Sequence, residues 1–171
     1  ADIVTPDSLV AVHIDHVGRH GSRYPASAAS CKKLHSALLH SDSLGLLTPT
    51  GRELLALTRQ AMTASQGRWG ALDSLGMAEQ RSIATRMMHR YDGLFKDGAR
   101  VRALSSYSPR SMMSMFCFLH QMSRMNNRLE ISSCSGRQNS PLMRPFDVSD
   151  DYQHFRSDRL WEPTYMAYFE Q

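Results

Sequence analysis

Lysine is scarce in this chain, which has 17 arginines but only three lysines among its 171 residues. Without a lysine-rich run or alternating aromatic and basic residues, nucleic-acid binding has little support. No apolar run approaches the length that spans a bilayer, so no membrane partner is expected. The three cysteines, Cys31, Cys117 and Cys134, form neither a CxxC pair nor a cluster with histidine, so no structural zinc site is expected.

The remaining composition is that of a globular protein. Apolar residues make up 42% and charged residues 21% of the chain, which is enough for one domain with a core and unlike a disordered segment. The formal net charge is +4. This mild excess of positive charge permits anionic partners without demanding them.

Strands and helices are expected to alternate along the chain. The apolar, β-branched residues 9–17 predict a strand that runs into a basic loop and then a helix. Leu47 to Met62 predict a helix with Thr48 as its cap and Pro49 at its first position. A longer helix is expected over 74–95, with Glu79 and Gln80 on its surface.

The second part of the chain repeats this layout. Residues 101–104 predict a strand, Arg110 then opens a helix, and residues 129–133 predict a third strand. Residues 139–155 read as loop or surface, and 160–171 as the start of another helix. Alternating strands and helices indicate an α/β fold with a parallel sheet. Three strands are few for such a sheet, so we expect the chain to be incomplete.

The stretch "VGRHGSRYP", residues 17–25, places three potential cations within five residues. A phosphate requires several converging donors, some of them permanently charged, and Arg19 and Arg23 provide two. His20 lies between them with a ring nitrogen that can attack phosphorus. Gly21 allows the backbone to approach closely. Arg110 follows another strand and can complete the ring, because loops after parallel strands share one crevice.

These residues carry a resemblance. "RHGSRYP", "LTPTG", "LGMAEQRSIATRMMHRYDGLF" and "SSYSPRSMMSM" together resemble the histidine phosphatase superfamily, in its acid phosphatase and phytase branch. They are most similar to multiple inositol polyphosphate phosphatases and their bacterial relatives. The resemblance implies a partial phosphoglycerate-mutase-like sandwich. Residues 1–133 would be the N-terminal part of its α/β domain, and 134–171 the start of a helical cap.

The resemblance also implies roles by position. His20 would be the nucleophile that forms a phosphohistidine, and Arg19, Arg23 and Arg110 would bind the transferred phosphoryl group without a metal or another cofactor. The reaction would be phosphomonoester hydrolysis, with inositol polyphosphates such as phytate as the sharper expectation for the substrate. The resemblance places the protein in the periplasm or outside the cell.

The family pattern is not complete in this sequence. Family members carry a late histidine followed by Asp or Ala-Glu, which supplies the proton donor, and no histidine here is followed in that way. The resemblance covers most of residues 8–133. We therefore expect a missing C-terminal half or a partner chain, and a fragment that binds phosphate without turnover is the alternative. Mutase-like enzymes typically have RHGE or RHGQ. Ser22, followed by Arg23, therefore disfavours a mutase-like enzyme.

Three other patterns have competing interpretations. Arg102 could substitute for Arg110 as the third phosphate ligand, although a strand position suits that role less well. His13 and His16 flank Asp15, but on a strand their side chains would point to opposite faces, so a metal site is not expected. The acidic run 147–151 lacks the glycine and terminal glutamate of a calcium loop, and we expect a solvated loop.

Overall fold

The protein has an α/β fold, as expected from the alternation of strands and helices. A computed structural model describes residues 9–159 and 161–169. Within these residues the principal elements are α1 (Ala28–Ser43), α2 (Pro49–Ser65), α3 (Ser74–Arg90), β1 (Arg100–Ser105), α4 (Pro109–Met125), β2 (Glu130–Ser135), α5 (Ser140–Met143), α6 (Asp150–Asp158) and α7 (Glu162–Phe169). No helix in this part of the chain is long and apolar enough to cross a bilayer.

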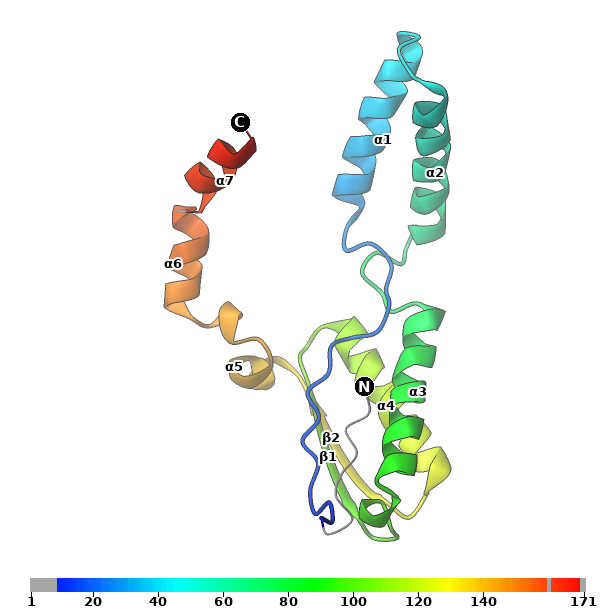
Figure 1. Ribbon diagram of the computed structural model, residues 1–171, viewed down its shortest axis with the longest axis vertical. Helices are drawn as coiled ribbons and strands as arrows, with labels where there is room; N and C mark the ends of the chain where they lie inside the picture. Colours follow the sequence, from blue (N-terminus) through cyan, green and yellow to red (C-terminus); the bar gives the residue numbers. More distant parts are fainter. Residues whose placement is uncertain (1–8, 160, 170–171) are drawn as a thin grey trace.

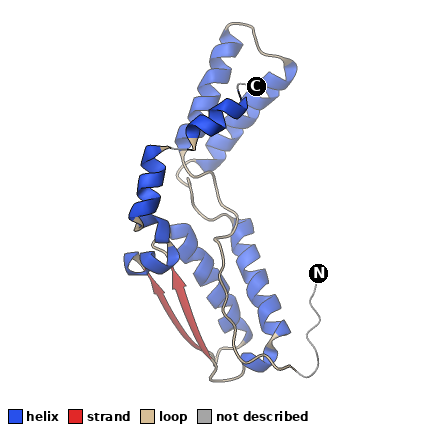
Figure 2. Ribbon diagram, turned by 60° about the vertical axis from the view of Figure 1, so that its left-hand side comes forward, coloured by secondary structure: helices blue, strands red, loops and turns tan. Residues whose placement is uncertain are grey.

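The sheet consists of two parallel strands joined by a helical crossover. β1 and β2 pair in register from Arg100 opposite Glu130 to Ser105 opposite Ser135, and α4 connects them. Helices α3 and α4 pack against each other, and α4 also contacts both strands; Figure 2 shows the strands side by side with these helices nearby. The core forms there around Ala84, Met88, Leu119 and Met122. The predicted strands at 101–104 and 129–133 are thus confirmed.

The predicted strand at 9–17 is wrong. These residues form no strand, and within the described chain their backbone groups join no ladder. Val10, Val12 and Val17 are at least 83% exposed. A β-branched, apolar run favours extended backbone, but a strand also requires a hydrogen-bonding neighbour, which local sequence cannot supply. The segment runs as an irregular trace beside the sheet (Figure 1).

Helices α1 and α2 form a hairpin that extends from the rest of the molecule (Figure 1). Thr48 caps α2 as predicted, because its side chain accepts a hydrogen bond from the Gly51 N–H at 3.1 Å. Two short segments, 22–25 and 70–73, connect the hairpin to the body, and we call them the neck. Their backbones are joined by hydrogen bonds from Tyr24 to residue 71, from Gly70 to residue 25 and from Asp73 to residue 22.

The chain after β2 is more helical than its composition indicates. Residues 139–155 were expected to be loop, but α6 begins at Asp150, where the Ser149 hydroxyl accepts a hydrogen bond from the Tyr152 N–H at 3.2 Å. The polar residues of this segment indicated a loop, although Ser149 is a normal N-cap for a helix. The helix expected over 160–171 is confirmed as α7, although 160, 170 and 171 lie outside the described residues. The division between 133 and 134 stays a prediction.

Candidate active site

The basic loop 19–23 is fixed by direct backbone contact with α3. A Cβ atom added to Gly21 would lie 2.4 Å from the carbonyl oxygen of Gly76, and one added to Gly76 would lie 2.2 Å from the carbonyl oxygen of Ser22. Only glycine allows two backbones to approach so closely. From the other side, the Gly21 N–H donates to Ser114 Oγ at 3.1 Å, and that hydroxyl donates to the Arg110 carbonyl at 2.8 Å. The loop is therefore held between α3 and α4.

Polar side chains of α3 hold the same loop. Asp73 caps α3 by accepting from the Gly76 N–H at 2.7 Å, and its other oxygen accepts from Ser22 Oγ at 2.7 Å. These bonds favour the ionised carboxylate, so they hold the pKa of Asp73 below its ordinary value. Glu79 accepts from the Ser22 N–H at 2.8 Å. Both carboxylates near the loop are thus bonded to Ser22.

Gln80 was expected on the surface of α3, and that expectation is wrong. Its side chain is buried and Nε2 donates to the carbonyl oxygen of Arg19 at 3.3 Å. A buried amide that bonds the backbone beside the candidate nucleophile fixes the start of the loop. The helical period gives the face on which Gln80 lies but not the loop that covers that face.

The histidine ring is oriented by its own backbone. His20 is half-buried, and its Nδ1 lies 2.8 Å from the carbonyl oxygen of Gly21. A carbonyl oxygen can only accept a hydrogen bond, so Nδ1 carries the proton in this contact. In the neutral ring the lone pair is then on Nε2. The geometry therefore leaves one defined nitrogen able to act as a nucleophile.

Four arginines converge at this loop. The Nε atoms of Arg23 and Arg110 are buried without a hydrogen-bond partner among the described residues. Burial lowers the pKa of Arg110, and the charges of Arg23, Arg144 and Arg19 lower it further. A buried N–H without a partner is costly, and like charges repel. An anion with several oxygens would satisfy both donors and relieve the repulsion.

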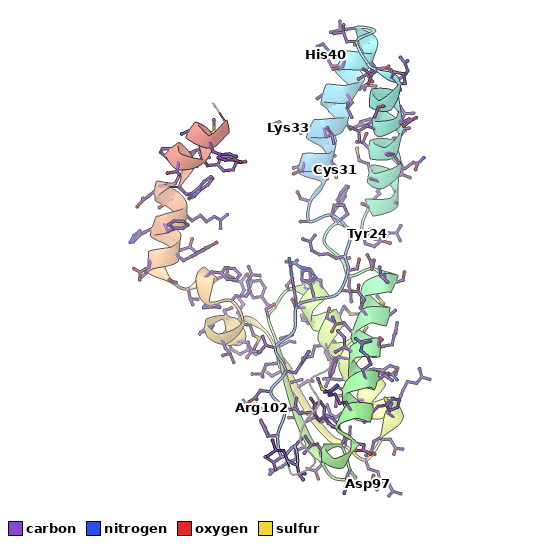
Figure 3. The ribbon with its side chains drawn as sticks, viewed as in Figure 1. Tyr24, Cys31, Lys33, His40, Asp97 and Arg102 are labelled. Carbon is purple, nitrogen blue, oxygen red and sulfur yellow. The ribbon has the colours of Figure 1, made fainter. Side chains whose placement is uncertain are left out.

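The neck also lies close to the guanidinium group of Arg110. A Cβ atom added to Gly70 would lie 4.0 Å from Nη1 of Arg110, and Gly70 has a positive φ of 71°. Figure 3 labels Tyr24 in the neck and Arg102 well below it on β1. Arg102 is exposed and is not among the charges that act on Arg110. The structure thus brings Arg19, Arg23 and Arg110 together and leaves Arg102 apart.

Several residues that support this site carry no signal in the local sequence. Asp73, Gly76 and Ser114 meet the loop only through the fold, because they come from two helices distant in sequence. Arg144 lies just after α5, in a segment where the apolar pattern fades. Each could have been recognised only with knowledge of which helices cover the loop.

The two other candidate clusters have ordinary interactions. His13 lies 3.2 Å from Asp15 in an exposed pair, and the ring of His16 stacks on Phe118 with centroids 5.4 Å apart. Over the described part of the chain, no group of three histidine, cysteine or acidic side chains gathers that could hold a metal. Asp147 of the acidic run forms an ion pair with Arg144.

A histidine with a defined free nitrogen, beside two guanidinium groups whose Nε donors lack partners among the described residues, can bind a phosphoryl group and accept it covalently. The family model of the histidine phosphatase superfamily (branch 2) matches residues 12–158. This range includes the basic loop, α3, α4 and both strands. No curated protein matches the chain.

Proposed function

The chain belongs to branch 2 of the histidine phosphatase superfamily, and we propose on that basis that His20 is the nucleophile with which it hydrolyses phosphate monoesters. Phosphatase chemistry through a phosphohistidine is the activity that this family implies. One observation carries the assignment to particular residues. Among the described residues, the buried Nε atoms of Arg23 and Arg110 have no hydrogen-bond partner, and they lie beside a histidine whose Nδ1 is bonded to a carbonyl oxygen.

The proposed reaction has two displacements at phosphorus. In the first, Nε2 of His20 forms a bond to phosphorus while the bond from phosphorus to the ester oxygen breaks, and the departing oxygen takes up a proton. In the second, water attacks the phosphohistidine, which releases orthophosphate and regenerates His20. Arg19, Arg23 and Arg110 bind the phosphoryl oxygens in both steps. Their fixed positive charge stabilises the negative charge that is spread over those oxygens.

A second candidate is a phosphate-binding protein that turns over slowly or not at all. The two carboxylates that contact the loop, Asp73 and Glu79, are both bonded to Ser22. Asp73 is a poor proton donor because the same contacts hold its pKa below the ordinary value. General acid catalysis commonly contributes about 10²–10⁴-fold. Esters whose leaving group needs a proton would then react slowly, while phosphate binding would be unaffected.

The test compares two substrates that differ in their need for a proton donor. p-Nitrophenyl phosphate has a good leaving group, whereas phytate releases an alkoxide. We expect the wild-type chain to hydrolyse the aryl ester and His20→Ala to have no activity. Acid-labile, base-stable labelling of the wild type by a radioactive phosphate ester would identify the phosphohistidine. His40→Ala is the matched control, because His40 is exposed and lies far along α1 (Figure 3).

The outcomes separate the two candidates. Turnover that disappears in His20→Ala and persists in His40→Ala supports the enzyme. Absence of turnover together with stabilisation by orthophosphate supports the binding protein. At a hundredfold excess of ligand over Kd, that stabilisation would be about 2.7 kcal/mol. Equal turnover in the wild type and His20→Ala would refute the assignment of the nucleophile.

For the substrate we propose inositol polyphosphates such as phytate. The support is the similarity of "RHGSRYP" and "RYDGLF" to multiple inositol polyphosphate phosphatases and the presence of further arginines beside the loop. A periplasmic or extracellular location and a second chain that supplies the proton donor are proposals that rest on the same similarity. Rates on phytate compared with a sugar monophosphate would test the substrate class.

A further inference from the structure

The peptide group between Gly21 and Ser22 is hydrogen-bonded on both of its sides. Its carbonyl oxygen accepts from Nδ1 of His20 at 2.8 Å, and its N–H donates to the Glu79 carboxylate, also at 2.8 Å. A single peptide group therefore connects the carboxylate to the imidazole. A negative charge at the N–H makes the carbonyl oxygen of the same group a stronger acceptor, because hydrogen bonds in a chain polarise one another.

Helix α3 holds this peptide group in place. A Cβ atom added to Gly76 would lie 2.6 Å from the Ser22 nitrogen and 2.9 Å from the Gly21 carbonyl carbon, which are the two atoms that form the peptide bond. Packing as close as this opposes rotation of the group. Glu79 follows Gly76 by three residues, and positions three apart share one face of a helix. Gly76 thus brings the loop near enough for Glu79 to accept from the Ser22 N–H.

The contact of Glu79 with this peptide group does not depend on a cation. Glu79 is exposed, and among the described residues it takes part in no ion pair. Its carboxylate is bonded instead to a backbone amide two residues after the candidate nucleophile. The negative charge of Glu79 is therefore directed at the one peptide group that also bonds the His20 ring.

We propose that Glu79 is a positioning residue for His20 and acts through the Gly21–Ser22 peptide group. The inference rests on the proposed function, in which Nε2 forms a bond to phosphorus while the bond to the ester oxygen breaks. Nδ1 keeps its proton throughout. The ring is therefore positively charged in the phosphohistidine and neutral again after water has released orthophosphate. The polarised carbonyl oxygen holds the Nδ1 proton and favours the charged ring, while Glu79 itself transfers no proton.

The first test observes the ring of His20 directly. Nitrogen NMR distinguishes a protonated from an unprotonated ring nitrogen, and the His20 signals are those that disappear in His20→Ala. We expect the Nδ1–H tautomer to predominate in the wild type and in Glu79→Gln, because the amide oxygen of glutamine still accepts from the Ser22 N–H. Glu79→Ala should shift the population toward the Nε2–H tautomer. Unchanged populations in Glu79→Ala would overturn the inference. Glu79 is exposed, so both variants should remain folded.

The second test measures how fast the phosphohistidine forms and decays, by rapid quenching with radioactive p-nitrophenyl phosphate. In Glu79→Gln the charge is lost, so formation should be slower and hydrolysis faster, because the ring is charged only between the two steps. The two factors should multiply to roughly fivefold, the difference between a charged and a neutral acceptor. Solvent screening of this exposed carboxylate excludes a much larger effect. Slower hydrolysis, as general damage to the loop would cause, or two unchanged rates would overturn the inference.

Glu53→Gln is the matched control. Glu53 is exposed on α2, beyond the neck, and its replacement changes the net charge equally. Both rates should remain those of the wild type, and equal effects in Glu53→Gln and Glu79→Gln would overturn the inference, since they would reflect net charge alone. Failure of the proposed function has a different signature. No acid-labile phosphate would then form on the wild type, whereas the tautomers of His20 would still report on the contact with Glu79.

Discussion

The contact between Gly76 and the basic loop gives a sharp prediction, because two effects of Gly76→Ala have opposite signs. Alanine is favoured over glycine in a helix by up to about 1 kcal/mol, so propensity alone predicts stabilisation. The new Cβ, however, would lie 2.2 Å from the Ser22 carbonyl oxygen and 2.6 Å from its nitrogen. These are backbone atoms, which cannot rotate away. Overpacking of this kind typically costs about 1–3 kcal/mol, so we expect net destabilisation.

The same crowding should weaken phosphate binding. Ser22 is next to Arg23, so movement of the loop away from the new Cβ would shift the Arg23 guanidinium relative to Arg110. Loss of one charge-assisted hydrogen bond lowers affinity roughly tenfold or more. The assay is urea unfolding followed by circular dichroism, with calorimetric titration of orthophosphate into the folded variant. Each kcal/mol lost would lower the Tm by about 2–4 °C.

Gly51→Ala is the control for this experiment. Gly51 is the third residue of α2, as Gly76 is of α3, and each donates its N–H to the capping side chain. A Cβ at Gly51 would be crowded by the end of the Leu47 side chain, at 3.0 Å, which can move, while Thr48 Oγ1 at 3.4 Å and Leu47 Cβ at 3.5 Å lie at ordinary van der Waals distance. Gly51→Ala should be neutral or slightly stabilising. If Gly76→Ala behaved in the same way and bound orthophosphate normally, the argument that this contact fixes the loop would be refuted.

Two further predictions concern the helix caps. Asp73→Asn keeps a capping side chain but removes the charge. The pKa of Asp73 is lowered in the folded protein. The carboxylate therefore stabilises the fold above its ordinary pKa, and this stabilisation is lost as the pH falls through the folded pKa. Urea midpoints of wild type and Asp73→Asn should therefore differ above about pH 5 and converge only as the pH falls from about 4 through the lower, folded pKa, and a difference independent of pH would contradict the role of the charge. Thr48→Ala removes the bond to Gly51 and should lower the free energy of unfolding by about 1 kcal/mol, while calorimetric affinity for orthophosphate stays unchanged because the cap is remote from the loop.

Local sequence predicted the elements whose signals are local. Thr48 and Pro49 identified the start of α2, and the helix expected after Arg110 is α4, whose Leu119 and Met122 enter the core. These predictions succeeded because a helix satisfies its hydrogen bonds within its own segment.

The predictions that failed depended on partners elsewhere in the chain. Residues 9–17 have the composition of a strand but no ladder partner in the described structure. Gln80 lies on a helix whose outward face is covered by the loop at Arg19. For the site, "RHGSRYP" identified the residues that we propose to act on phosphate. The helices that hold this loop, and the contribution of Arg144, required the three-dimensional arrangement.

The neck also constrains the order in which this site can assemble during folding. The basic loop reaches its position only when residues 22–25 meet residues 70–73, which are separated by the whole α1–α2 hairpin. Closing a segment of this length has an entropic cost that grows only slowly with further length. The helical hairpin forms from contacts between neighbours in sequence and can therefore bring its two ends together early. The arginines of the loop and Arg110 would then meet late, after most of the chain that separates them has already folded.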